Sequence, residues 1–553
     1  YCNALRCSDG LVYPTIIAEP AWESFLVAIE RPDLLDDPRF ATWELREANF
    51  EVLDYAAQAW AQGKRAAEAL ATLQQLRVPS AATEGVAQLL EDPQAAAREL
   101  WQAVEHPVAG TLRYPGPAWL SDTLQTRSGR APLLGEHQSR LDPPATPRQP
   151  RSRNMGEREL PLRGLRVIDL TQVWAGPFAS AMLADLGADV IHIESATRPD
   201  MTRWWGVLHG LDAPFYERSA YFRQHNRGKR SLILDLARES ARDTVRRLVA
   251  RSDIVLNNFS RRVLGNWGLG YEELRAVNPR VIWGTMPSYG ATGPWADYRS
   301  FGDALQAACG IVAHRGYAPG EPMRVSCSMT DPYAGLTMAA LLLAALRVRD
   351  SSGDSVYLDL SQRDNVVRFV GDEILAYQLS GIEPGSWGDE HPEHAPHRAY
   401  RCAGDDRWVA IAVTTDDQWR ALCRVTLLPA LAGDPALQTA TGRRANRPRI
   451  DEAIEAWTAR REAGYVETHL VRAGVPAAVV RETAELLEQP QLADRGFFPW
   501  VDDPVAFTSR YPATPFKIEG LPIRQSRRAP LFGEHTRAIL TEVLGLPEHE
   551  IAA

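Results

Sequence analysis

The sequence predicts an α/β protein with an open, mostly parallel sheet covered by helices on both faces, together with a smaller α+β domain. Three observations predict this class. A strand–helix–strand unit begins near Gly164, short β-branched runs recur as far as Leu360, and stretches with helical spacing separate these runs. Alternating strands and helices are typical of a parallel sheet whose strands are joined by crossover helices.

The strand–helix–strand unit pairs GLRVIDL, residues 164–170, with DVIHIE, residues 189–194. The intervening segment is expected to form a helix after Ala175-Gly176-Pro177. Four further strands are expected at residues 231–236, 253–259, 280–286 and 355–360. The second, α+β region begins near Arg398 and ends near Gln491.

An internal repeat links the two ends of the chain. VPSAATEGVAQLLEDPQ at Val78 returns as VPAAVVRETAELLEQPQ at Val475, and 475 − 78 = 397. Trp22 matches Trp419 at the same offset, and RAPLLGEH at residue 130 returns as RAPLFGEH at residue 528, an offset of 398. The chain is therefore interpreted as the back portion of one module followed by a complete second module. We expect the front of the first module in the same polypeptide or in a companion chain.

The repeat and the composition of the chain predict seven segments. The third is rich in proline and arginine, which is typical of an extended linker. They are a small domain of the incomplete first module (1–105), its return segment (106–140), a linker (141–160), the large domain of the second module (161–375), a linker (376–397), a second small domain (398–491), and a return segment with a C-terminal helix (492–553).

Composition excludes several classes of function. The formal charge of −9 over 553 residues does not favour nucleic acid or anionic membranes as partners. The six cysteines show neither a disulfide framework nor metal-type spacing, and the turn after the first strand has no G-x-G-x-x-G, so no metal, nicotinamide or flavin is expected. The longest apolar run, 334–346, is too short to span a bilayer and predicts a buried helix. We expect a cytoplasmic protein.

Two groups of residues near predicted strand ends are candidates for ligand binding. RQHNRGKRS, residues 223–231, carries Arg223, Arg227, Lys229 and Arg230, which favour either a solvated basic loop or a clamp for phosphate. Asn258-Phe259 ends another strand and can hold an adenine ring or belong to the core.

Asp331 opens the apolar helix in the stretch SMTDPYAGLTMAALLLAAL. Aspartate at the N-cap followed by proline at the first helical position is a common helix start, which would contribute about 1 kcal/mol. Because the following helix is so apolar, the carboxylate is also expected at the edge of a buried region. A carboxylate at a helix N-terminus stays ionised and can act as a nucleophile where water is excluded.

Several motifs together resemble the class III coenzyme A transferases. They are RGLRVIDLTQVWAGPFASAMLADLGADVIHIES, the PDMTR of residues 199–203, NRGKRSLILDL, the stretch from GLGYEEL to GATGPW, and the segment around Asp331. The resemblance covers residues 161–541, and residues 1–140 resemble the tail of another copy. It implies interlocked rings, each with a Rossmann-like large domain and a small domain, so that a tandem chain would form a pseudo-dimer; a homodimer is also possible.

The resemblance implies an acyl-CoA:carboxylate CoA-transferase whose substrates are an acyl-CoA and a carboxylic acid. Asp331 would form a mixed anhydride with the donor acyl group and then an aspartyl-CoA thioester. The residues implied to contact CoA are Gln172, Val173, Trp174, Ala175, Arg203, Arg227, Lys229, Asn258, Phe259, Arg299 and Phe301. The chain departs from the pattern at Ser260-Arg261-Arg262, at Asn266 and in the sparse glycines of PGSWG, residues 384–388, so the lid and acceptor are expected to differ.

Other functions stay open. A 2-methylacyl-CoA racemase would need a histidine where Gly302 stands, and a non-catalytic CoA-binding scaffold would not need Asp331. The histidines of EHPEHAPH, residues 390–397, are interpreted as part of a solvated linker rather than a metal site. For the acceptor, small dicarboxylates compete with betaine-like acids of the carnitine or dimethylsulfoniopropionate type, with or without a following lyase step. A cation cage for such an acid would draw on Trp174, Trp204, Trp205, Trp267 and Trp387.

Overall fold

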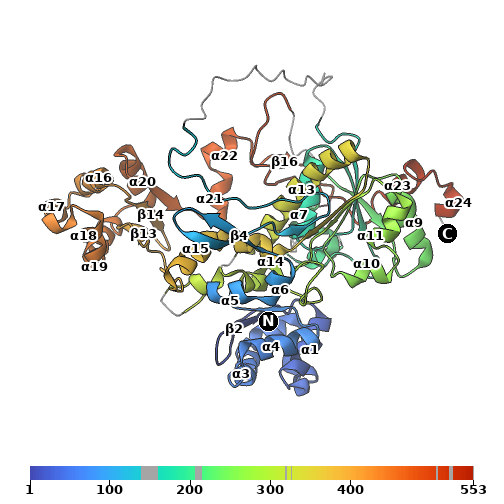
Figure 1. Ribbon diagram of the computed structural model, residues 1–553, viewed down its shortest axis with the longest axis horizontal. Helices are drawn as coiled ribbons and strands as arrows, with labels where there is room; N and C mark the ends of the chain where they lie inside the picture. Colours follow the sequence, from blue (N-terminus) through green and yellow to red (C-terminus); the bar gives the residue numbers. More distant parts are fainter. Residues whose placement is uncertain are drawn as a thin grey trace. The chain divides into compact units, whose positions relative to one another are not determined.

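A computed structural model describes residues 1–138, 160–205, 214–317, 321–324, 327–505, 508–521 and 527–551. The chain forms two compact units (Figure 1). Unit 1 contains residues 1–313, 324–384 and 496–553, and unit 2 contains residues 314–323 and 385–495. Most of the predicted linker 141–160 lies outside the described residues. The predicted linker 376–397 begins too early, because helix α15 (Gly371–Ser380) continues through its first five residues.

Unit 1 is organised around a seven-stranded sheet with the order β6-β12-β11-β10-β7-β8-β9. Six of these strands are parallel neighbours, which confirms the predicted α/β class. They are β7 (Arg166–Asp169), β8 (Asp189–Glu194), β9 (Arg230–Ile233), β10 (Ile254–Asn257), β11 (Ile282–Thr285) and β12 (Val356–Leu360). Each lies within or beside a segment that its β-branched residues predicted. The seventh strand, β6 (Trp119–Leu120), belongs to the first module and pairs antiparallel with β12.

Helices cover both faces of this sheet. On one face, α7 (Ala175–Asp185) and α13 (Thr330–Ser352) pack against each other and against the strands, with Val167, Leu256 and Met338 in the shared core. On the other face lie α9 (Glu239–Val249), α11 (Tyr271–Val277) and α23 (Thr536–Glu542). Among the described helices, α13 alone is long and apolar enough to cross a membrane. Its contacts with α7 show that it serves here as a core helix.

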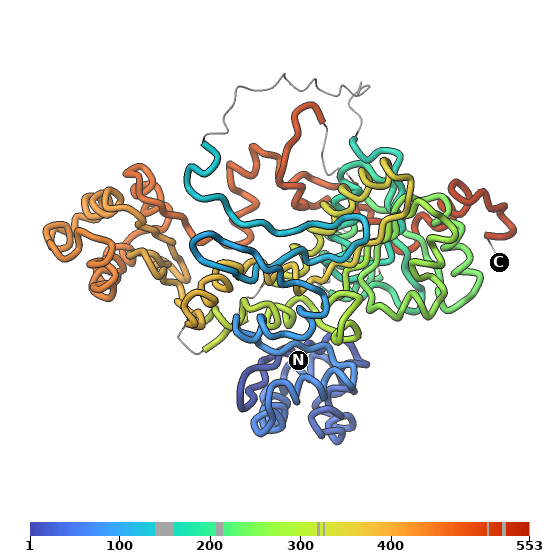
Figure 2. Tube along the Cα trace, viewed as in Figure 1, coloured from blue at the N-terminus to red at the C-terminus, as the bar shows by residue number. Residues whose placement is uncertain are grey.

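The first small-domain copy also belongs to unit 1, and Figure 2 follows it in blue from the N-terminus. Its antiparallel strands β1 (Leu5–Arg6), β2 (Leu11–Pro14) and β3 (Ser80–Ala82) pack against several helices. The helices are α1 (Glu19–Ala28), α2 (Trp43–Ala48), α3 (Phe50–Ala61), α4 (Ala66–Gln75), α5 (Val86–Glu91) and α6 (Pro93–Ala97).

A buried group of charges fastens this copy to the large domain, and we call it the charged seam: Glu84, Asp92, Arg98, Asp359, Arg363 and Asp364. Arg98 donates to Asp359 at 2.6 Å and to Asp364 at 3.0 Å. Arg363 lies 2.7 Å from Glu84 and also donates to Asp92. Both arginines are buried, so these pairs are shielded from water.

Unit 2 is built on the second small-domain copy, in which β13 (His397–Arg401), β14 (Trp408–Ala412) and β15 (Ala477–Val480) form an antiparallel sheet. Its helices α16 (Asp416–Thr426), α18 (Ala440–Ala445), α19 (Arg447–Thr458) and α20 (Ala463–Arg472) begin 397 residues after α1, α2, α3 and α4; for the first pair, 416 − 19 = 397.

The two copies share an internal framework. Arg46 stacks on Trp22 and pairs with Glu19 in the first copy, whereas Arg443 stacks on Trp419 and pairs with Asp416 in the second. The repeat predicted from sequence therefore corresponds to two domains with the same local packing. Interlocked rings and a pseudo-dimer stay predictions.

Candidate active site

The loop between β7 and α7 is held by side chains from two other segments. The Gln172 N–H donates to the Asn258 side-chain oxygen at 3.0 Å, and the Asn258 amide donates back to the Gln172 carbonyl oxygen at 2.7 Å. The Val173 N–H donates to the buried carboxylate of Asp200 at 3.1 Å. Val173 has φ of +74°, a conformation that a β-branched residue rarely adopts. Such backbone strain persists only where the surroundings impose it, and it concentrates at functional sites.

Asp331 lies in the first turn of α13, next to this loop. It was expected to be the N-cap, but this was wrong: the helix begins at Thr330, and Met329 before it already has helical dihedral angles of −65° and −30°. Pro332 remains compatible because the N–H groups of the first turn have no partner within the helix. The carboxylate of Asp331 does not cap its own helix and instead accepts a hydrogen bond from the Ala175 N–H at the start of α7.

Two glycines bring Asp331 and the loop together. A Cβ added to Gly335, one turn after Asp331, would lie 2.7 Å from the Ala175 carbonyl oxygen, so this glycine allows α13 and α7 to approach. A Cβ added to Gly302 would lie 1.8 Å from Oδ2 of Asp331. Any side chain at position 302 would therefore displace the carboxylate. The room that Gly302 leaves is part of how Asp331 is positioned.

The surroundings of Asp331 disfavour its charge. Burial raises the pKa of its carboxyl to about 7, the neighbouring carboxylate of Asp303 contributes to the same shift, and the hydrogen bond from Ala175 opposes it. The residue nevertheless keeps partial exposure to solvent. The arrangement provides a carboxylate that is reachable, weakly solvated and close to backbone N–H groups at a helix N-terminus. Chemically, such a group can attack an electrophilic carbonyl once it is ionised.

The four cations of the basic segment, predicted to form either a solvated loop or a phosphate clamp, each pair with a carboxylate, and the clamp stays a prediction. Arg223 pairs with Asp503 and Arg230 lies 2.6 Å from Asp189. Arg227 lies 2.6 Å from Asp185, and Lys229 lies 2.9 Å from Asp169 with its ammonium buried. These cations hold strand ends and helices together. Burial lowers the pKa of Lys229, while Asp169 opposes that shift.

The remaining sequence-predicted residues divide into two groups. Arg203 is fully buried and donates to both oxygens of Glu194, so it supports the segment that carries Asp200. Arg299 is exposed, and its backbone is fixed by Gln74 of the first small-domain copy. Asn258, Phe259 and Phe301 are partly exposed. The roles of all these residues in CoA binding stay predictions.

Helix α8 (Ala220–His225) contributes aromatic residues that sequence reasoning missed. Tyr221 lies near Asp331. Burial raises the pKa of the Tyr221 phenol, and the charge of Asp331 raises it further. His225 packs 4.7 Å from the Tyr221 ring and 5.2 Å from that of Trp174. Its Nδ1 donates to the Tyr221 carbonyl at 2.8 Å, and burial lowers the pKa of His225 to about 4, so the ring is neutral. No motif marks these residues, because their role depends on α8 packing beside α7.

The tryptophans proposed as a cation cage are not gathered at one place. Trp174 and Trp205 both contact Tyr221 edge to face, with centroids 5.7 and 5.5 Å away. Trp267 packs in the core on the α9 face of the sheet, and Trp204 contacts Phe215. Trp387 belongs to unit 2. Within unit 1, Trp174 and Trp205 are the two whose ring contacts place them beside Tyr221.

Unit 2 contains the predicted histidine-rich linker and a separate cavity. The rings of His391 and His394 stack at 4.6 Å and that of His397 lies 4.9 Å from His391, an arrangement not expected for a solvated linker. Within the described ranges, no group of three His, Cys, Asp or Glu residues is suited to a metal ion.

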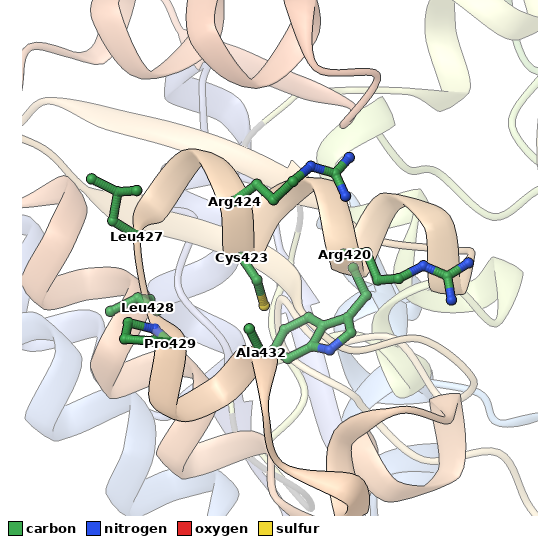
Figure 3. Close-up of a pocket in the computed structure, with 8 residues that line it drawn as sticks. Arg420, Cys423, Arg424, Leu427, Leu428, Pro429 and Ala432 are labelled. Atoms are coloured by element: carbon green, nitrogen blue, oxygen red, sulfur yellow. The ribbon is translucent and has the colours of Figure 1, made fainter.

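The cavity is about 550 Å³ and is formed by α16, α17 (Pro429–Ala432) and the turn between them (Figure 3). Its lining is largely apolar and consists of Trp419, Arg420, Cys423, Arg424, Leu427, Leu428, Pro429 and Ala432. No carboxylate lines it, so it lacks the nucleophile that the Asp331 site provides.

Comparisons with known proteins show the family to which the chain belongs. Residues 1–138 and 162–536 match CoA-transferase family III. A succinate–glutarate CoA-transferase of Agrobacterium fabrum is 32% identical over 397 residues, which cover 70% of this chain and 97% of the relative. A probable CoA-transferase of Mycobacterium tuberculosis is 29% identical over 564 residues, covering 98% of this chain and 68% of the relative.

Among solved structures, a CaiB/BaiF family protein from Brucella suis superimposes with a TM-score of 0.64 at 32% identity, covering 70% of this chain and all of that protein. Both module portions of the chain match the same family, and the matched ranges include the loop after β7 and Asp331. The chain belongs to CoA-transferase family III.

Proposed function

We propose that this protein transfers CoA from an acyl-CoA to a carboxylic acid through covalent intermediates on Asp331. The observation that carries the proposal is the position of the Asp331 carboxylate, packed against Gly302 and facing the N–H of Ala175. The strained loop at Val173 places further backbone groups beside it. A carboxylate nucleophile suits this exchange, because every bond that it forms is about as reactive as the bond that it replaces.

The transfer proceeds in four balanced steps. The ionised Asp331 oxygen attacks the donor thioester carbonyl, forming a mixed anhydride as the C–S bond breaks and CoA leaves as a thiolate. The thiolate attacks the aspartyl carbonyl and releases the donor acid. The acceptor carboxylate then attacks the aspartyl thioester, giving a second anhydride and free thiolate. Finally, the thiolate attacks the acceptor acyl carbonyl, which forms the new acyl-CoA and restores Asp331.

The backbone donors near Asp331 support these steps. Each attack develops negative charge on a carbonyl oxygen, and one well-placed N–H donor is worth about 3 kcal/mol in the transition state. The N–H of Ala175 lies at the start of α7, where the helix dipole adds to its effect. Because only the ionised carboxylate attacks, kcat/KM should rise with pH and level off above about pH 7, the pKa of Asp331.

Trapping tests the proposal directly. The protein is incubated with acetyl-CoA and hydroxylamine, and peptides are mapped by mass spectrometry. We expect a hydroxamate on Asp331, loss of this label in Asp331→Asn, and its retention in the matched control Asp303→Asn. Label on no residue, or on a residue other than Asp331, would contradict the proposal.

The acceptor is proposed to be a small dicarboxylic acid. The similar protein of Agrobacterium fabrum carries succinate and glutarate in its name, and both are dicarboxylic acids. A betaine-like acceptor is less well supported, since Trp174 and Trp205 direct their rings toward Tyr221. A panel of acids offered with acetyl-CoA, with the products identified by mass spectrometry, distinguishes the two classes.

A racemase has little structural support at this site. A histidine at position 302 would occupy the space of the Asp331 carboxylate. His225, with a pKa of about 4, is too weak a base to share proton transfer at neutral pH. Incubating a chiral 2-methylacyl-CoA in deuterated water is expected to give no deuterium at the α-carbon.

A further inference from the structure

An arginine with spare hydrogen-bonding capacity lies beside the nucleophile. The Nη1 atom of Arg324 is buried and makes no hydrogen bond to any described residue. Its nearest carboxylate oxygen, Oδ2 of Asp303, is 3.7 Å away, which is long for a hydrogen-bonded ion pair. The side chain as a whole is 26% exposed, so part of it is open to solvent. A guanidinium offers five N–H donors in a planar fork that matches a carboxylate.

The position of Arg324 follows from the way Asp331 is packed. Gly302 lies directly against the Asp331 carboxylate, and Asp303 follows it in the chain. Asp303 accepts a hydrogen bond from Ser328, three residues before Asp331, and its other oxygen faces Arg324. Asp303 is therefore a neighbour of both Arg324 and Asp331.

Charge at the site makes a cation necessary for an acidic acceptor. Burial is the main cause that raises the pKa of the Tyr221 phenol. The charges of Asp331, Asp303 and Asp200 lie close enough to raise it further. A second carboxylate on the acceptor would be repelled by this group. Other cations near the sheet edge, Arg203, Arg227 and Lys229, are already buried against carboxylates. Arg324 is the described cation beside Asp303 that retains an unused donor.

Tyr13 of the first small-domain copy lies near this arginine. Tyr13 of β2 is buried, and the charges of Arg324 and Arg6 both act to lower the pKa of its phenol, although burial dominates and raises it. Arg6 is exposed at the end of β1. Arg324 of the large domain and Arg6 of the first copy therefore both lie near the same tyrosine.

We propose that Arg324 binds the remote carboxylate of a dicarboxylic acid acceptor while the other carboxylate attacks at Asp331. This inference rests on the proposed function and adds the residue that selects the acceptor. Arg324 is a specificity-determining residue: it contacts the end of the acceptor that does not react.

The test compares two acceptors of equal length, glutarate and pentanoate, with acetyl-CoA as donor. Wild-type protein is expected to prefer glutarate. In Arg324→Gln, we expect kcat/KM for glutarate to fall by about 30–100-fold and that for pentanoate to change by less than about 3-fold, as for loss of one charge-assisted pair. Arg324→Lys is expected to recover part of the glutarate activity. Arg261→Gln, which removes another arginine weakly paired with a carboxylate, is the matched control and should leave both acceptors unchanged.

Two further readouts keep the outcome decisive. Hydroxylamine trapping on Asp331 with acetyl-CoA alone shows whether Arg324→Gln retains a folded site and an active donor half-reaction. Suppose that wild type is labelled, and that in Arg324→Gln the kcat/KM values for glutarate and pentanoate fall equally or both stay unchanged. The specificity role of Arg324 is then overturned while the proposed function stands. If wild type itself is not labelled, the proposed function fails. Glutarate, but not pentanoate, should also protect Arg324 from modification by phenylglyoxal, and equal protection would contradict the inference.

Discussion

The charged seam and the Asp331 site are two clusters of buried carboxylates in the same unit, and they treat their charges differently. In the seam, Arg98 and Arg363 together contact all four carboxylates. The pairs with Asp359, Asp364 and Glu84 are 2.6–3.0 Å long. At the site, Asp331 has the neighbouring carboxylate of Asp303 and a single backbone donor, Ala175. Burial is common to both, so the difference lies in the partners.

This contrast separates a structural use of charge from a chemical one. Paired charges in the seam hold the first small-domain copy on the large domain, and removing one partner would leave others buried and uncompensated. Among the described residues no guanidinium pairs with the Asp331 carboxylate, so burial raises its free energy in the folded protein, as the proposed role of a nucleophile requires. Even in the seam, burial raises the pKa of Glu84 to about 7, since two arginines serve four acids.

The largest effect is expected from breaking the seam. Arg363→Met leaves Glu84, Asp92 and Asp364 without this guanidinium, so the free energy of unfolding should fall by about 3–5 kcal/mol, as measured by chemical denaturation. Arg481→Met is the matched control, because Arg481 stands at the position of Glu84 in the second copy and its pair with Glu467 is partly exposed. A loss of less than about 1 kcal/mol for Arg363→Met would contradict the account.

Filling the space at the site should affect chemistry more than stability. In Gly302→Ala the new Cβ would fall 1.8 Å from the Asp331 carboxylate, which must rotate away from the Ala175 N–H. We expect kcat to fall by about 100-fold or more, as for loss of one oxyanion donor and its geometry. The matched control is Gly265→Ala, where a Cβ meets nothing within 4 Å. Unchanged kcat in Gly302→Ala would show that the carboxylate works from another position.

Removing the charge of Asp331 should raise the free energy of unfolding, whereas breaking the charged seam should lower it. The folded-state pKa of Asp331 is about 7 and its ordinary value is 3.8, so the wild-type fold loses stability as pH rises between these values. Asp331→Asn escapes this loss and should be more stable than wild type by about 1–3 kcal/mol at pH 8. The advantage should shrink toward zero near pH 4, and denaturation at both pH values checks it. Lower stability of the variant at pH 8 would contradict the account.

The smallest effect is expected from relieving strain beside the site. Val173→Gly removes a β-branched residue from φ of +74° and should raise the free energy of unfolding by about 1 kcal/mol. Arg77→Gly is the matched control: its φ is +62°, its side chain is not β-branched, and the second copy has Gly474 at the equivalent position. We expect less than half the gain there, and equal gains would show that Val173 is not specially strained.

The fold was largely predictable from sequence because its signals are local or repeated. Buried parallel strands require runs such as RVID in β7 and IVLN in β10, and these runs are visible without a structure. The offset of 397 residues predicted two small domains with the same framework, and Trp22 and Trp419 occupy equivalent places. Fold class therefore follows from local patterns, and the pairing of the small domains follows from the repeat.

The site was less predictable because it depends on contacts between distant residues. Whether a cation such as Lys229 faces solvent or a buried Asp169 depends on a partner 60 residues away. The helix start was misplaced because Pro332 is compatible with several first-turn positions, and the angles of Met329 leave no mark in the sequence. The contribution of Tyr221 depends on how α8 packs on α7. Asp331 itself was singled out from the sequence because an isolated acid at the start of an apolar helix is conspicuous, and its catalytic role stays a prediction.

Isotope transfer tests the central claim most directly. The protein is turned over with acetyl-CoA and an acceptor acid whose carboxyl oxygens are all isotopically heavy, and the peptide that contains Asp331 is then weighed. If the acceptor forms an anhydride with Asp331, collapse of that anhydride must leave one heavy oxygen on the aspartate side chain. An Asp331 peptide of unchanged mass, despite formation of the new acyl-CoA, would show that CoA moves without this carboxylate.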